Sequence, residues 1–313
     1  MVRVRPPAVA GAFYPGEETA LRRVVRRLFA EAEAEADGRP APAVVGPHAG
    51  YQYSGVVAAR AHARLAHARR VILLGPSHYE PVTRPALAPF EAFATPLGEV
   101  KVDLEAVERL AHEPHFTVSA EAHLPEHSLE VHLPFLQERL PEAQIVPCLM
   151  GIGDPAPVVP ALAGLISEGD TALLVSTDLS HYHPDAAARA MDSALLDSLL
   201  AGDLDAVRAG EACGRGALLA LAGVAMLLGW KGKLIAYATS SQAGGSTSSV
   251  VGYAALAYAT SGDAGFGTRP RGKAEKRERD SRPRSQPTGA ARREGPALVS
   301  RPGHPSRERR KPQ

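Results

Sequence analysis

Three histidines of the chain share a setting that could support metal or acid–base chemistry. Each lies a few residues after a short apolar run that ends in small or turn-forming residues. They are His48, after residues 43–45; His78, after residues 71–74; and His181, after residues 171–175. Such runs predict buried strands. Ligands of α/β sheets bind outside the carboxyl ends of the strands, so the three side chains can meet at one site.

His48 and His78 are the first candidates for metal ligands, because each follows a strand and a Gly-Pro pair. Histidine is the commonest metal ligand in proteins, and two histidines with a carboxylate form a typical site. Asp178, at the third strand end, can supply that carboxylate. It could instead act as a catalytic base, orient a catalytic His181, or cap the turn that follows.

A second pair of histidines lies in the segment EHSLEVHLPFLQ. His127 and His132 are five residues apart, which is about 140° around a helix. The two side chains cannot share a helical face, so we expect only one of them at the site. We prefer His132 for a catalytic role, because it lies beside Pro134 and an apolar stripe.

Other residues near these motifs are expected to shape the site. Tyr51, Tyr53 and Ser54 follow His48 closely and are predicted to line the cleft, although tyrosines beside glycines are also common packing residues. Cys213 precedes a predicted helix, whose N-terminus can lower the pKa of a thiol. We nevertheless interpret Cys213 as a small buried apolar residue.

The order of the elements predicts an α/β fold with a mainly parallel or mixed central sheet and helices on both faces. Helices are expected over residues 21–36, 56–67, 103–111, 158–166, 186–200 and 215–228. Further strands are expected near residues 86–93 and over 144–149, 233–239 and 249–259. A Ser/Gly-rich loop, residues 240–248, separates the last two strands.

Length and composition indicate one large domain, residues 1–262, in a chain of 313 residues that is 45% hydrophobic. No apolar run approaches the ~20 residues of a membrane span, and the start of the sequence lacks the apolar region of a signal peptide. Two cysteines without such a signal favour a reducing cytoplasm. We therefore expect a cytoplasmic protein that does not contact membranes.

The last 51 residues differ in composition from the rest. Residues 263–313 carry 15 Lys+Arg and 6 Asp+Glu, whereas residues 1–262 carry 20 and 28. The segment is rich in Arg, Pro, Ser and Gly and has few large apolar residues, so we expect a disordered basic tail. Contact with nucleic acid is expected only through this tail.

Seven motifs, in this order, resemble those of the Memo family, whose bacterial and archaeal members are called AmmeMemoRadiSam system protein B. They are AGAFYP, PHAGYQYSG, GPSHY, EHSLEVHLPFLQ, STDLSHY, ACGRG and SSVVGYAALAY. The resemblance runs from about residue 4 to residue 260. It implies a fold similar to that of class III extradiol ring-cleaving dioxygenases of the LigB type, which use non-haem Fe(II).

The resemblance also implies roles for particular residues. His48 and His78 match metal-site histidines of the family, Asp178 and His181 match residues that line the same pocket, and His132 matches a histidine found in some members. The implied cofactor is a divalent metal, with iron preferred and copper or zinc as alternatives. The implied partners are an AMMECR1-domain protein and a radical SAM protein.

One position departs from the family pattern. Where family members can place a cysteine or an acidic residue after the penultimate strand, this chain has Ala243, which cannot bind a metal. Either Asp178 completes the site, or the neighbouring Gln242 supplies a weak ligand at the edge of the pocket, or metal binding is impaired.

Three functions remain open at this point. The first is a metal-dependent, oxygen-using oxidoreductase related to the dioxygenases. The second is a non-catalytic module that binds a peptide or small anion in a vestigial cleft. The third is a metal-dependent hydrolase, in which bound water is the nucleophile.

Deleting residues 263–313 is expected to leave the melting temperature nearly unchanged, because the segment has too few apolar residues to form part of a core. Differential scanning calorimetry of the full and truncated chains measures this directly. A large fall in melting temperature would place the domain boundary later than residue 262.

Overall fold

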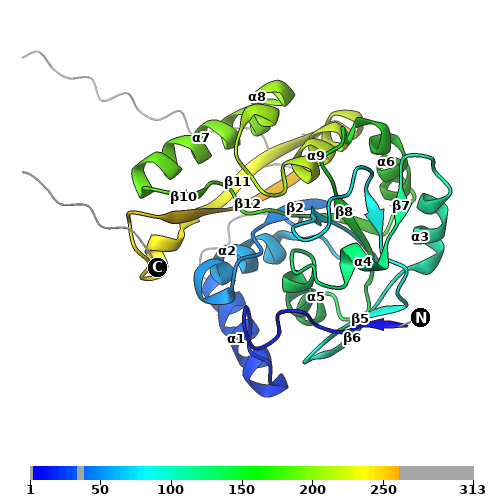
Figure 1. Ribbon diagram of the computed structural model, residues 1–313, viewed down its shortest axis with the longest axis horizontal. Helices are drawn as coiled ribbons and strands as arrows, with labels where there is room; N and C mark the ends of the chain where they lie inside the picture. Colours follow the sequence, from blue (N-terminus) through cyan, green and yellow to red (C-terminus); the bar gives the residue numbers. More distant parts are fainter. Residues whose placement is uncertain (1–2, 34–38, 261–313) are drawn as a thin grey trace, which may run out of the picture. The chain divides into compact units, whose positions relative to one another are not determined.

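The computed structural model describes residues 3–33 and 39–260, and its centre is a mixed β-sheet (Figure 1). Four parallel strands form the middle of the sheet, in the order β2, β9, β3, β8. Their bounds are Ala43–Gly46 (β2), Thr171–Ser176 (β9), Arg70–Pro76 (β3) and Gln144–Met150 (β8). Nearly all of their residues are buried, as expected for strands covered on both faces.

Further strands extend this sheet on both sides. On one side β12 pairs antiparallel with β2, and β10 and β11 pair antiparallel with β12; on the other, β4 pairs antiparallel with β8 and parallel with β7. A small separate sheet has the order β1, β5, β6. The bounds are Val250–Thr260 (β12), His181–His183 (β10), Trp230–Thr239 (β11), Ala86–Leu87 (β4), Thr117–Val118 (β7), Val4–Arg5 (β1), Ala92–Thr95 (β5) and Gly98–Lys101 (β6).

Helices cover both faces of the main sheet (Figure 1). One layer contains α1 (Glu18–Glu33), α2 (Tyr51–Arg64) and α5 (Leu133–Arg139). The other contains α6 (Val159–Ser167), α7 (Asp185–Ala201), α8 (Leu204–Ala209) and α9 (Arg215–Leu228). The remaining helices are α3 (Leu104–Ala111), α4 (Ala120–His123) and the short 3₁₀ helices η1 (Glu130–His132), η2 (Ala156–Val158) and η3 (Ser240–Ala243). In the described part of the chain, no helix is long and apolar enough to cross a membrane.

The predicted α/β class, with a mixed sheet between two layers of helices, is confirmed. The helix predicted over 103–111 is also confirmed, and the Asp103 side chain caps it by accepting from the Ala106 amide. The strand predicted near 86–93 is instead two strands in different sheets, β4 and β5. The predicted tail, residues 263–313, lies outside the described residues.

The sheet order brings the predicted site residues to one edge. β2, β9 and β3 are adjacent and parallel, with Gly46 opposite Ser176 and Leu74 opposite Val175. Parallel neighbours end at the same edge of a sheet. The loops that follow these three strands, which carry His48, Asp178 and His78, therefore lie together.

A buried ion pair attaches the N-terminal segment to one of the site loops. The Arg5 guanidinium donates to the Glu130 carboxylate and to the main-chain oxygens of His123 and Glu126. Glu130 also accepts from the Tyr14 hydroxyl at 2.6 Å. The Arg5 and Glu130 side chains are fully buried. This pair therefore fixes the segment between His123 and Glu130, which contributes to the site.

Replacing Arg5 with alanine is expected to lower the free energy of unfolding by about 3–5 kcal/mol, because it leaves the Glu130 charge buried without its partner. Urea unfolding measures the change. The matched control is Arg3→Ala, which removes an exposed pair with Glu91 and should change stability little. Equal, small effects of both changes would contradict the assigned role of the buried pair.

Candidate metal centre

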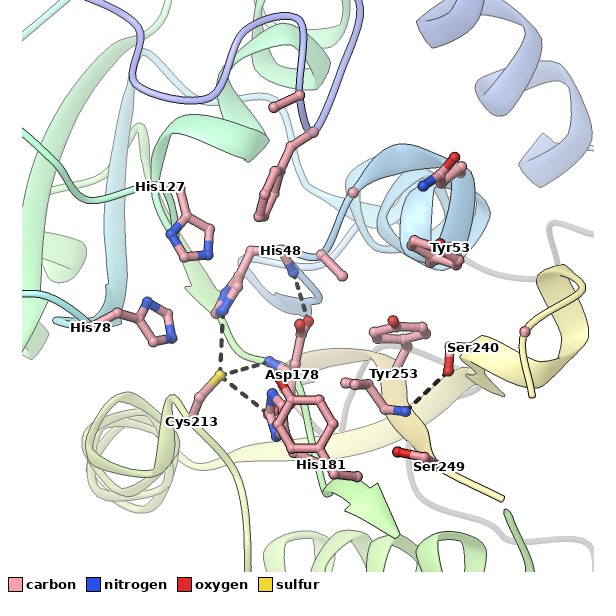
Figure 2. A pocket seen from close by; sticks show the side chains of 18 of the residues that line it. His48, Tyr53, His78, His127, Asp178, His181, Cys213, Ser240, Ser249 and Tyr253 are labelled. Carbon is pink, nitrogen blue, oxygen red and sulfur yellow. Dashed lines mark hydrogen bonds between the residues drawn. The ribbon is translucent and has the colours of Figure 1, made fainter. Parts of the chain in front are cut away.

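A cavity of about 860 Å³ opens where the three strand ends meet (Figure 2). Its wall combines apolar and aromatic groups with side chains that can bind metals or transfer protons. The latter are His48, His78, His127, Asp178, His181 and Cys213. A largely apolar cavity with a few converging polar groups is the usual form of a small-molecule site.

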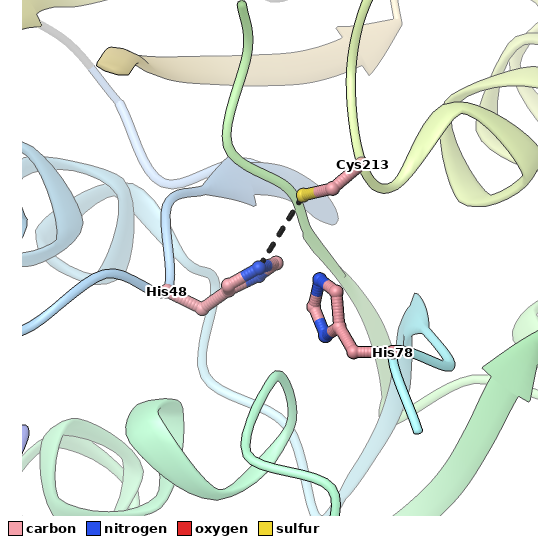
Figure 3. Close-up of side chains that lie close together, drawn as sticks. All are labelled: His48, His78 and Cys213. Carbon is pink, nitrogen blue, oxygen red and sulfur yellow. Dashed lines mark hydrogen bonds between the residues drawn. The ribbon is translucent and has the colours of Figure 1, made fainter. Parts of the chain in front are cut away.

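Two of the predicted ligands meet a third donor that the sequence interpretation did not assign to the site. One ligand atom each from His48, His78 and Cys213 lies within 4.8 Å of the others (Figure 3). The His48 Nε2 to Cys213 Sγ distance is 3.3 Å. Two imidazoles and a thiol in this arrangement suit a transition-metal ion. The structure thus corrects our interpretation of Cys213 as merely a small apolar residue.

His48 is held by contacts on both its ring and its backbone. Its ring Nδ1 lies 2.7 Å from Ser176 Oγ, at the end of β9. Its backbone amide donates to the Asp178 carboxylate at 2.9 Å. Burial, followed by the neighbouring imidazoles, lowers the pKa of His48 well below its ordinary value. The ring is therefore neutral and can offer Nε2 as a metal ligand.

His78 is oriented by the buried carboxylate of Glu126. The ring Nδ1 lies 2.9 Å from Glu126 Oε1, and the His78 amide donates to the same carboxylate. Glu126 also accepts from the amides of His127 and Ser128. Burial alone would raise the pKa of Glu126, but the contacts with His78 and with the Ser128 amide lower it to about 2. An ionised carboxylate that accepts from Nδ1 leaves Nε2 free for a metal.

Cys213 lies just before α9, where its neighbour Gly214 packs against the end of β9. A Cβ at Gly214 would lie only 2.5 Å from the Ser176 carbonyl oxygen. The Cys213 sulfur accepts from the Asp178 amide at 3.2 Å. Burial and the nearby Asp178 carboxylate raise the pKa of the Cys213 thiol to about 12. A thiolate here would need a nearby cation, so binding of a metal at this position would be coupled to loss of the thiol proton.

Asp178 lines the cavity but does not join the three converging donor atoms. Its carboxylate faces the backbone amides of His48 and Ala49. Burial raises the pKa of Asp178 to about 7, although these amides and His78 oppose the shift. A carboxyl group with this pKa can gain or lose a proton near neutral pH.

Of the two histidines in the segment after α4, His127 rather than His132 lies in the cavity. The prediction that His132, rather than His127, points into the site is therefore wrong. His127 precedes η1 in a turn, so the two residues do not share one regular helix. His127 stacks on His78, with ring centroids 4.8 Å apart, whereas His132 is fully buried beneath Ser176.

The remaining predicted site residues divide between the cavity and its surroundings. His181, at the start of β10, and Tyr53 line the cavity. Tyr51 and Ser54 are buried behind it, where their hydroxyls donate to the carbonyls of Val131 and Ala49. The Gln242 side chain accepts from the Thr239 amide, in a capping box outside the cavity, and the adjacent Ala243 is exposed. The structure thus brings the thiol of Cys213, and not position 243, to the two histidines.

The fold and the site define an α/β protein with a cluster of two histidines and a cysteine, which could hold a metal, at the carboxyl edge of its sheet. A family model described as Memo-like protein matches residues 5–257, so the chain belongs to the Memo family. A MEMO1 family protein of Methanosarcina mazei is 36% identical over 270 residues, which are 82% of this chain and 99% of the relative. MEMO1 family protein MTH_45 of Methanothermobacter thermautotrophicus is 37% identical over 277 residues, or 81% and 99%.

Among solved structures, the uncharacterized protein JW3007 from Escherichia coli K12 matches 69% of this chain and 98% of its own. The TM-score is 0.45 and the sequence identity 13%, a likeness too distant to carry an argument.

Replacing Asp178 with asparagine should change how stability depends on pH in the metal-free protein. Since the folded-state pKa of about 7 exceeds the ordinary 3.8, the folded state binds an extra proton between these values. The wild type should therefore lose stability relative to Asp178→Asn as pH rises through this window, by up to about 1.4 kcal/mol per pH unit. Urea unfolding at pH 4 to 8 tests this; parallel pH profiles would contradict it.

Proposed function

We propose that this protein binds a redox-active transition metal through His48, His78 and Cys213 and uses it as a metal-dependent oxidoreductase of the dioxygenase-like type. The observation that carries the proposal is the convergence of the three donor atoms within 4.8 Å in a cavity. The neighbouring Glu126 and Ser176 side chains orient the two imidazoles, as supporting groups do in metalloproteins.

The donor set restricts the metals that fit. A thiolate is a soft ligand, and imidazole suits iron, copper, zinc and nickel, so magnesium and calcium are poor matches. Iron remains our preferred metal, since the resemblance to the dioxygenases favours it, with copper or zinc as alternatives. A redox-active ion would supply electron transfer or activation of a bound substrate.

The chain's own residues would bind the substrate and handle protons. Asp178, with its pKa of about 7, can hold or release a proton beside the ligands. His181 lies in the same cavity, and burial lowers its pKa, so its neutral ring can accept a proton. Phe13, Tyr53 and Tyr253 form aromatic parts of the wall that favour a substrate with apolar surface.

The two other functions receive less support. Among the described residues that line the cavity, none is Lys or Arg, so the site does not favour a free anion. A peptide could still enter the open cavity without metal chemistry. A hydrolase would use the same ligands with zinc, and the identity of the bound metal separates it from an oxidoreductase.

The family and the thiols support proposals for the partners and for the compartment. We propose that the protein acts with an AMMECR1-domain protein and a radical SAM protein, as the name of the family's system suggests. Cys148 and Cys213 are both free thiols. A thiol ligand must stay reduced, which supports a cytoplasmic location.

Each of the single changes His48→Ala, His78→Ala and Cys213→Ala should abolish stoichiometric metal binding. The two donors that remain cannot hold the ion at physiological metal concentrations. We expect affinity losses above the about 10–100-fold that follows loss of a supporting group. Elemental analysis of anaerobically purified protein gives the metal and its stoichiometry.

The matched control is His67→Ala, which removes an exposed histidine outside the cavity and should leave the metal content unchanged. Iron or copper near one per chain supports an oxidoreductase, and zinc supports a hydrolase. A wild type without bound metal, or three variants that retain it, would overturn the proposal.

A further inference from the structure

A buried chain of hydrogen-bonding side chains leads from α2 to the metal-facing His48. His62 Nε2 lies 2.9 Å from His132 Nδ1, and His132 Nε2 lies 3.0 Å from Ser176 Oγ. Ser176 Oγ lies 2.7 Å from His48 Nδ1. All four residues are at most 2% exposed. The chain is separate from the ligand cluster and touches it only through His48.

The hydroxyl of Ser176 determines where the protons of this chain lie. Its oxygen is also 2.7 Å from the Ser128 carbonyl oxygen, which can only accept. A hydroxyl has a single proton, so Ser176 must donate it to Ser128. Any other arrangement would leave two oxygen lone pairs facing each other at 2.7 Å. The rings of His48 and His132 must then both donate to Ser176 Oγ.

The remaining protons follow from the neutrality of the rings. Burial lowers the pKa of His132 to about 3, and that of His62 well below its ordinary value, so each ring has one N–H. His132 uses its proton at Nε2 and must accept at Nδ1 from His62 Nε2. The other nitrogen of His62, Nδ1, then carries a lone pair, and it is the ring atom without a hydrogen-bond partner.

We propose that Ser176, supported by Ser128, His132 and His62, holds His48 in the Nδ1–H tautomer and so keeps the lone pair of its Nε2 directed at the metal. These are positioning residues, since none of them touches the ion. The proposal rests on the proposed function only in taking His48 as a metal ligand. The Cys213 sulfur, 3.3 Å from His48 Nε2, is compatible with this tautomer, because a neutral thiol can donate to that lone pair or to the Asp178 carbonyl oxygen, 3.5 Å away.

The packing shows that the chain is built into the fold. A Cβ at Gly46 would lie 3.2 Å from the His132 ring, so glycine at the end of β2 leaves room for that ring. The ring of Phe135 stacks on His62, with centroids 5.0 Å apart and planes 18° apart. These contacts hold both imidazoles in place without supplying another polar partner.

The first test measures the tautomers themselves in the metal-free, full-length protein. Long-range ¹⁵N–¹H NMR spectra distinguish rings protonated at Nδ1 from rings protonated at Nε2. We expect His48 at Nδ1 and His132 at Nε2 in the wild type. In Ser176→Ala, His48 should shift to a population protonated at Nε2. In His62→Phe, His132 should keep its proton at Nε2, because Ser176 Oγ still requires a donor. A wild-type His48 protonated at Nε2, or a His48 tautomer that is unchanged in Ser176→Ala, would overturn the proposal.

The second test measures metal affinity by competition with a chelator. Ser176→Ala should weaken binding about 10–100-fold. The control is Ser167→Ala, which removes a hydroxyl that donates to the Ala163 carbonyl within α6, far along the chain from the ligands, and should leave affinity unchanged. Equal affinities of Ser176→Ala and the wild type would overturn the positioning role. Failure of the wild type to bind any metal would refute the proposed function alone, because the tautomers are measured without metal.

Discussion

The geometry of the site depends most on the hydrogen bonds that the ionised carboxylate of Glu126 accepts. It binds the backbone and ring of His78, at the end of β3, and the amides of the turn that carries His127. A buried charge is stable only when such donors replace water. Four residues further on, Glu130 holds the N-terminal segment through Arg5. Two buried carboxylates in one short segment thus connect the sheet edge, the stacked histidines and the start of the chain.

Much of the fold and half of the site could be predicted from the sequence. Apolar runs followed by Gly-Pro pairs identify β2 and β3, and their carboxyl ends place His48 and His78 together. Cys213 could not be placed in this way, because it follows no strand and its approach depends on how α8 and α9 return to the sheet edge. Local patterns do not encode contacts between residues 165 positions apart, such as His48 and Cys213.

The choice between His127 and His132 shows a different limit. Helical spacing assumes one continuous helix, but here a turn comes first, then η1, then α5 from Leu133. The five-residue separation therefore says nothing about which ring reaches the cavity. The position of His132 is buried outside the cavity, where its ring contacts other side chains of the fold. Its partners are Ser176 and His62, and neither can be inferred from spacing.

Because Gly214 closely approaches the end of β9, a substitution at this position would affect the candidate metal site. The sulfur of Cys213 sits where it does because the next residue has no side chain to separate the loop from Ser176 and Thr177. Any larger residue at 214 would displace the Cys213 thiol from the candidate metal site while leaving the cysteine itself unchanged. Natural sequences should therefore vary more freely at the exposed position 243 than at position 214, where only glycine fits. Cys213 and Gly214 are therefore expected to be retained or lost together.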